Sequence, residues 1–318
     1  MNQQAIGGYF ELELRRGQVY HSVAIALNSA RHCLEYILRV RGYRKVYIPY
    51  YTCNVVLAPI QRLGIEIARY EVDAKLNPLH CPDLGDGEAF LYTNYFGLKQ
   101  RAVEELAEKY GSRLIVDNAQ AFYAPALSGI DTFYSPRKFF GVPDGGYLYT
   151  EMAPLSILEQ DKSYNRMSHL LRRIDEGAEA GYADFRRNSE ELGSAPIRRM
   201  SCLTEALLAN IDYAAIAQAR RVNFTHLHGA LAALNQLELP MLEDSVPMVY
   251  PFRTDDKELR DKLIANKVFV ATYWPGICDD AKTPSLERNL VNKVIPIPID
   301  QRYTIDDMER IINLIKKH

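Results

Sequence analysis

The chain has 318 residues, 47% of them hydrophobic, enough to bury one large core or two unequal ones. Its 38 basic and 40 acidic residues are well mixed and give a formal charge of -2, so no global field attracts nucleic acid or an anionic membrane. Five widely spaced cysteines without a CxxC pair argue against a disulfide framework and a structural zinc site. No long apolar run or signal peptide is evident, so we expect a cytoplasmic protein with no membrane span.

The first half of the sequence alternates short apolar strands with helical periods. Apolar residues recur at helical spacing from Ala30 to Leu38, after the N-cap candidates Asn28 and Ser29 and before Gly42. The further elements expected in chain order are a strand at 45–49, a helix at 52–63, strands at 65–70 and 89–93, a helix at 101–110, and strands at 113–117 and 132–134. This alternation predicts an α/β fold with a mainly parallel sheet that binds ligands at the carboxyl ends of its strands.

The second half has weaker strand signals. We expect a polar helical region at 155–191 that links and contacts a partner, and then a long helix at 203–234. The elements expected after it are strands in VPMVYPF, VFVATY and VIPIPI, a helix at 258–266, and a last helix opened by a capping box of Thr304 and Asp307. We therefore expect a large α/β domain over 1–200 and a smaller α+β domain over 201–318.

Several common signatures are missing from the sequence. No GxGxxG follows a strand, and neither GxxxxGK[ST] nor HExxH occurs. The residues His226 and His228 are two apart, which on a helix directs them to different sides. We therefore expect neither a dinucleotide site nor a metal site.

The segment LIVDNAQAF, at 114–122, places an acid at the end of an apolar strand. Asp117 would lie where a parallel sheet binds its ligands, and a carboxylate there needs a cationic or hydrogen-bonding partner. A simple turn or helix cap is the other interpretation. Ala119 and Gln120 add a small residue and a side-chain amide within reach of a bound ring.

The segment FYSPRKFFGVPDGG, at 133–146, places a lysine among bulky apolar residues. Lys138 lies between Pro136 and the pair Phe139 and Phe140, so we expect it to lose hydration and to react as a free amine. A surface lysine at a turn is the alternative. Lys138 follows Asp117 by 21 residues with one expected strand between them, so the two side chains can meet.

Pyridoxal phosphate (PLP) is a cofactor that needs such a pair. It forms a Schiff base with a lysine, and a carboxylate keeps its ring nitrogen protonated. Its phosphate needs an anion site, which the helix start at Ser29, Ala30 and Arg31 would supply through backbone N–H groups, a hydroxyl and a positive charge.

The sequence resembles the DegT-type sugar aminotransferases, a branch of the fold-type I PLP enzymes, over nearly its whole length. The segments that carry the resemblance are NSARHCL (28–34), IPYYT (48–52), TNYFG (93–97), LIVDNAQA (114–121), SPRKFFGVPDGG (135–146), RRMS (198–201) and the C-terminal VIPIPIDQRYTIDDMERII. By this resemblance Lys138 binds PLP, Asp117 pairs with the ring nitrogen, Gln120 contacts the side of the ring hydroxyl and Ala119 packs on a ring face. The remaining candidate cofactor contacts are Ser29, Ala30, Arg31, Tyr51, Cys53 and Ser135. The candidate substrate contacts are Tyr9, Phe10, Asn94, Arg199, Tyr273 and Trp274.

The resemblance implies a PLP-dependent aminotransferase that moves an amino group from an amino acid such as glutamate to a keto sugar. We expect the sugar to be nucleotide-linked and the pathway to serve surface polysaccharide or amino-sugar biosynthesis. The family's enzymes are homodimers with shared active sites, which would let Arg199 act across the interface.

Three positions depart from the family's pattern. Phe133 replaces a phosphate-binding serine, Cys53 an aromatic residue, and Ile197 an asparagine that reaches the neighbour's phosphate. Two alternatives therefore remain open: a PLP-dependent sugar dehydratase or eliminase, and a non-catalytic regulatory protein that keeps the fold.

Overall fold

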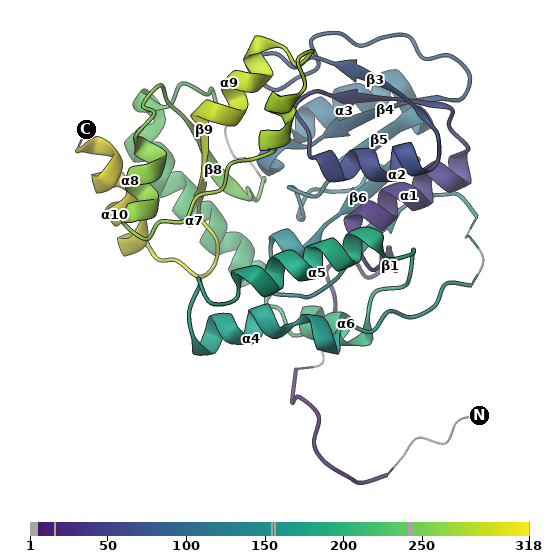
Figure 1. Ribbon diagram of the computed structural model, residues 1–318, viewed down its shortest axis with the longest axis horizontal. Helices are drawn as coiled ribbons and strands as arrows, with labels where there is room; N and C mark the ends of the chain where they lie inside the picture. The colour runs from purple at the N-terminus through teal and green to yellow at the C-terminus, as the bar shows by residue number, and fades with distance from the viewer. Residues whose placement is uncertain (1–5, 16, 154, 156, 241–243, 318) are drawn as a thin grey trace.

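The computed structural model describes residues 6–15, 17–153, 155, 157–240 and 244–317, so Met1 and the expectation about a leader there lie outside the described residues. A seven-stranded sheet has the order β1-β7-β6-β5-β4-β2-β3 (Figure 1). Its strands are β1 (Ile25–Leu27), β2 (Lys45–Pro49), β3 (Glu66–Tyr70), β4 (Glu88–Thr93), β5 (Leu114–Asn118), β6 (Asp131–Tyr134) and β7 (Gly146–Tyr149). The pairs from β3 to β6 are parallel and only β7 runs antiparallel to its neighbours, which confirms the predicted α/β class.

Helices cover both faces of this sheet. The helices of the first half are α1 (Ala30–Arg41), α2 (Leu57–Arg62) and α3 (Gln100–Tyr110). Leu34 and Ile37 of α1 pack with Ile115 of β5 in one buried cluster. Leu106 of α3 packs with Val116 of β5 in a second cluster on the other face. Successive strand residues point to opposite faces, so the apolar run of β5 fills both cores.

The second half forms three helices beneath the sheet and a compact C-terminal unit (Figure 1). Its helices are α4 (Ser168–Asp175), α5 (Tyr182–Ser194), α6 (Cys202–Ala209), α7 (Tyr213–Leu231), α8 (Leu259–Ala265), α9 (Ser285–Lys293) and α10 (Ile305–Lys316). The strands β8 (Val249–Arg253) and β9 (Val294–Pro298) form an antiparallel pair against which α7 packs, and α10 packs on α7. The capping box of Thr304 and Asp307 is present at the start of α10, as predicted.

Several expected elements differ from the structure. The long helix at 203–234 is two helices, because the Asp212 side chain accepts a hydrogen bond from the backbone N–H of Ala215 at 3.0 Å and starts α7 anew. The described part of 155–163 contains no helix, and VFVATY forms no strand. The edge strand β1 and the antiparallel β7 were not expected, because each is too short to show a period.

Gly145 and Gly146, at the start of β7, allow two backbone segments to approach closely. A Cβ atom on Gly146 would lie 2.5 Å from the backbone nitrogen of Ala30, so only glycine fits against the start of α1. Gly145 adopts a φ of 119° and its N–H donates to the Asn28 carbonyl at 2.9 Å. This contact ties the end of the lysine-bearing segment to the first turn of α1.

Candidate active site

Asp117 lies at the carboxyl end of β5, in the middle of the sheet. It is 6% exposed, and its carboxylate accepts a hydrogen bond from the backbone N–H of Ala119 at 2.8 Å. Burial raises the pKa of Asp117, while the positive charge of Lys138 and the Ala119 N–H act to lower it. The structure thus brings the lysine and the acid within electrostatic range of each other.

Lys138 ends a short 3-10 helix, Pro136–Lys138, that follows β6. Its side chain is exposed, so the expectation of a buried amine is wrong for the single chain. The reason is that Phe139 and Phe140 turn into the core and leave the lysine on the outside. The guanidinium of Arg220, on α7, lies 4.6 Å from the centre of the Phe139 ring and anchors the segment from the other half of the chain.

Polar side chains surround Asp117 on neighbouring strand ends. Gln120 accepts a hydrogen bond through Oε1 from the backbone N–H of Phe96 at 2.8 Å. Its Nε2 atom is buried and has no hydrogen-bond partner among the described residues, and the same holds for Oγ1 of Thr93. Thr93 is the register partner of Asp117 on β4 and shares its face of the sheet. Thr93 was not among the predicted site residues, although it ends a strand next to the acid.

A group of packed aromatic side chains lies beside these strand ends. The ring of Phe96 stacks on Tyr273 with 6.2 Å between centroids, and Trp274 meets the edge of Tyr51 at 4.6 Å. The Tyr95 hydroxyl donates to the Tyr51 carbonyl at 2.8 Å. Phe96 and Trp274 have φ values of 59° and 57°, conformations that cost an L-residue on the order of 1–3 kcal/mol and that gather at binding sites.

At the predicted phosphate site at the start of α1, the Ser29 hydroxyl is not free, contrary to our expectation. His32 donates through Nε2 to the Ala195 carbonyl at 2.9 Å, so its Nδ1 accepts the Ser29 hydroxyl proton at 2.9 Å. The Ser29 oxygen also accepts the N–H of His32. The hydroxyl is therefore committed to capping α1. Ala30 follows as the first residue of the helix, and Arg31 carries buried nitrogen atoms that lack a partner in the described structure.

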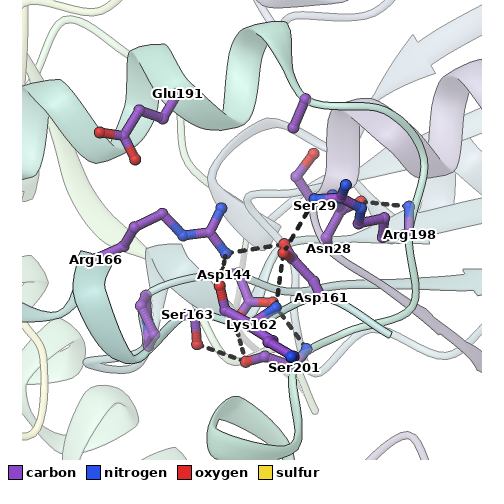
Figure 2. Close-up of polar contacts among 12 residues, drawn as sticks. Asn28, Ser29, Asp144, Asp161, Lys162, Ser163, Arg166, Glu191, Arg198 and Ser201 are labelled. Atoms are coloured by element: carbon purple, nitrogen blue, oxygen red, sulfur yellow. Dashed lines mark hydrogen bonds and ion pairs between the residues drawn. The ribbon is translucent and has the colours of Figure 1, made fainter. Parts of the chain in front are cut away.

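A second polar network joins the connections on either side of α4 and α5 (Figure 2). The buried Asp144 carboxylate accepts hydrogen bonds from the backbone N–H of Ser201 at 2.9 Å, from its hydroxyl at 2.7 Å, and from the hydroxyl of Thr204. Arg166 donates to Asp161 at 2.8 Å. These contacts hold the segment 198–201 beside β1, where Arg199 bridges to Leu27. Neither acid was among the predicted site residues, because no local pattern marks them.

Three other predicted cofactor contacts lie near Asp117, Arg31 or the lysine segment. Ala119 is 7% exposed next to Asp117, Cys53 is half-buried near Arg31, and Ser135 precedes the 3-10 helix of the lysine segment. Asn94 is a correction: it is fully buried, its Oδ1 accepts the Lys99 N–H at 2.9 Å and its Nδ2 donates to Gln100 at 3.3 Å, so it is not available to a substrate.

Three further candidates are exposed. Arg199 lies on the surface, in a groove at the edge of the sheet, and no described contact joins it to Asp117 or Lys138. Tyr9 and Phe10 are 100% and 92% exposed on an N-terminal segment that leaves the body of the molecule (Figure 1). Among the described residues, no group of side chains could hold a metal ion and no helix is long and apolar enough to cross a membrane.

The sequence matches no protein-family model, and no curated protein matches it. Solved structures do match. The sugar aminotransferase CalS13 from Micromonospora echinospora is 16% identical over 94% of this chain and 88% of its own, with a TM-score of 0.65. A DegT DnrJ EryC1 StrS aminotransferase from Brucella abortus is 17% identical over 92% and 85%, with a TM-score of 0.61. The PLP form of Spr1654 from Streptococcus pneumoniae is 15% identical over 92% and 86%, with a TM-score of 0.62. The chain therefore has the fold of the fold-type I sugar aminotransferases, as its resemblance to the DegT type predicted.

Proposed function

We propose that this protein is a PLP-dependent aminotransferase that transfers an amino group from an amino acid to a keto sugar. The observation that carries the proposal is the pair of Lys138 and Asp117 at adjacent strand ends, with the lysine charge acting on the buried acid. The shared fold with solved sugar aminotransferases supports the same assignment.

The residues around Asp117 suit the ring of PLP. A buried carboxylate with a raised pKa gains a counter-charge from a protonated ring nitrogen. Nε2 of Gln120, which has no partner among the described residues, is a donor for the ring hydroxyl, and the small side chain of Ala119 suits packing against a flat ring. Thr93 adds an unpartnered hydroxyl on the same face. In this proposal Lys138 holds the cofactor covalently.

The chain's own residues would then carry out proton transfer and charge stabilisation. When bound, PLP supplies an electron sink for the carbanion of the amino donor. The Nζ atom of Lys138, as a free amine, would take the proton from the donor's α-carbon and deliver it to the C4′ carbon of the cofactor, a form of catalysis that contributes typically about 10²- to 10⁴-fold. The Asp117 carboxylate keeps a proton on the ring nitrogen. Phe96 and Tyr273 form a wall that excludes water from one side.

We also propose specific substrates and an assembly for this protein. We assign glutamate as donor, a nucleotide-linked keto sugar as acceptor, and amino-sugar or surface polysaccharide biosynthesis as the pathway. We also assign a cytoplasmic location and a homodimer. The exposure of Lys138 in a single chain supports the homodimer, because a second copy would shelter the amine and bring its Arg199 to the site. We also propose a division into a large domain at 1–200 and a small one at 201–318.

Replacement of the lysine tests the proposal directly. We expect Lys138→Ala to lose both the visible absorbance of bound PLP and all amino transfer, because no other amine takes its place. Absorbance spectra and a half-reaction screen of the pyridoxamine-loaded protein against keto sugars measure both quantities. The exposed Lys162→Ala variant is the control. Amino transfer by purified Lys138→Ala would refute the assignment.

The two alternatives give different products. A dehydratase would release a deoxygenated sugar without nitrogen from a labelled amino donor, and a regulatory protein would bind PLP without converting it to the pyridoxamine form. Incubation with labelled glutamate and analysis of the sugar by mass spectrometry separates these outcomes from transamination.

A further inference from the structure

Helix α5 contacts both the lysine segment and α1. The Nδ2 atom of Asn188 donates to the Pro143 carbonyl at 2.7 Å, and the Ala195 carbonyl, just after the helix, accepts from His32 of α1 at 2.9 Å. Figure 1 shows α5 running toward β1 and α1. The middle and the C-terminal end of the helix are thus fixed to elements that border the candidate active site.

Two arginines lie under one face of α5. Ser189 and Gly193 are four residues apart, so they stand one above the other on this face. Arg137 donates through Nη2 to the Ser189 hydroxyl at 3.1 Å. A Cβ atom on Gly193 would lie 2.9 Å from Nη1 of Arg31, so the glycine makes the room that this guanidinium occupies. Arg31 comes from α1 and Arg137 immediately precedes Lys138, so the helix brings two separate elements together.

Three nitrogen atoms of the two guanidinium groups lack a partner among the described residues, although Nη2 of Arg137 is bonded to Ser189. Nε and Nη1 of Arg31 and Nε of Arg137 are buried and make no hydrogen bond within the described structure. Burial lowers the pKa of Arg137 to about 10, and the neighbouring Arg31 charge acts in the same direction. Leaving buried donors of a charged group unsatisfied is costly.

Among the described contacts, no nearby acid pairs with either arginine: the charge of Asp144 favours the charged form of Arg137 but leaves its Nε unsatisfied. Asp144 is already engaged by Ser201 and Thr204, and Asp161 is paired with Arg166. An anion that enters beneath α5 would satisfy the free donors and offset the repulsion between the two arginines. Guanidinium groups match the geometry of phosphate oxygens closely.

We propose that Arg31 and Arg137 bind a phosphate group beneath α5, and that this phosphate belongs to the cofactor; the inference rests on the proposed function. Arg31 lies two residues from Ser29, whose hydroxyl is committed to His32. Phe133, which stands where the resembling family has a phosphate-binding serine, is buried in the apolar cluster beneath α1. The arginines therefore replace hydroxyl groups as the phosphate ligands of this chain.

The test compares PLP with pyridoxal, which lacks the phosphate, on the full-length protein. Both aldehydes report on Lys138 through visible absorbance, but only PLP reports on the arginines. We expect Arg31→Met to weaken PLP binding roughly 10- to 100-fold and to leave pyridoxal binding unchanged, since a charge-assisted contact is lost.

Gly193→Ala is a second variant that disturbs the site while keeping both arginines. It keeps the phosphate site testable if Arg31→Met does not fold. Alanine favours a helix over glycine, so the variant should fold at least as well. Its methyl group would displace the Arg31 guanidinium and should reduce PLP affinity roughly tenfold, again without effect on pyridoxal. Glu190→Ala, on the exposed side of the same helix, is the matched control and should behave as the unmodified protein.

The outcomes separate the two proposals. If the unmodified protein binds neither aldehyde through Lys138, the proposed function fails. If it binds both, but the ratio of their affinities is the same in Arg31→Met, Gly193→Ala and the control, the function stands and the phosphate site is refuted. Inorganic phosphate should compete with PLP and not with pyridoxal. If phosphate raises the melting temperature without displacing PLP, the site serves a different phosphate and the assignment to the cofactor is overturned.

Discussion

Among single residues, Asp117 is a buried acid whose charge receives little compensation from the protein. Its carboxylate is 6% exposed and receives one backbone hydrogen bond, and burial raises its pKa in spite of the lysine charge. A group whose pKa is raised in the folded state stabilises the fold most below its ordinary pKa, 3.8 here, and loses that contribution as the pH rises through the folded value. A cationic ring nitrogen beside Asp117 would stabilise the charged carboxylate and so offset the free-energy cost of burying it.

Asp117→Asn should therefore have opposite effects on the cofactor-free and the loaded protein. Without cofactor, the amide removes the buried charge, so the variant should melt at a higher temperature at neutral pH, and the difference should vanish below the ordinary pKa of aspartate. With PLP, the variant should gain less in melting temperature than the unmodified protein does. Thermal melts across pH, with and without PLP, provide the measurement. A lower melting temperature of the cofactor-free variant at neutral pH would contradict the account.

At the scale of elements, the lysine segment is placed by its neighbours. Phe139 is held from α7 by Arg220 and from the C-terminal segment by Gln301, whose Nε2 donates to the Phe139 carbonyl at 3.0 Å. Asp144, at the other end of the segment, caps α6 through Ser201. The exposure of Lys138 is thus a consequence of contacts with distant parts of the chain, which local sequence does not reveal.

Asp144→Asn should loosen this connection. An amide nitrogen in place of a carboxylate oxygen cannot accept the donors from Ser201 and Thr204, so we expect a loss of roughly 2–4 kcal/mol in the free energy of unfolding. Urea denaturation measures it. The control is Asp255→Asn, whose exposed carboxylate pairs with Lys293 at the surface and whose loss should change the free energy of unfolding far less. Equal losses for the two variants would show that the cap contributes little.

At the scale of the whole molecule, the sequence predicts what local patterns determine. Apolar strands such as β5 and the capped start of α1 are encoded within a few residues, and the order of the elements implies the parallel sheet that brings strand ends together. The break between α6 and α7, the docking of α5 and the use of the Ser29 hydroxyl by His32 depend on partners distant in the chain or on one competing side chain. The residue types of the candidate site could therefore be predicted, whereas the environment of Lys138 and of the arginines could not.

In the proposed function, Lys138 and Asp117 hold the two ends of one PLP ring. Reduction of the PLP-loaded protein with borohydride, followed by proteolysis and mass spectrometry, tests it most directly. We predict a single phosphopyridoxyl group on the peptide that contains Lys138, and its loss in Asp117→Ala at limiting PLP. Labelling spread over surface lysines, with Lys138 unmodified, would contradict the account.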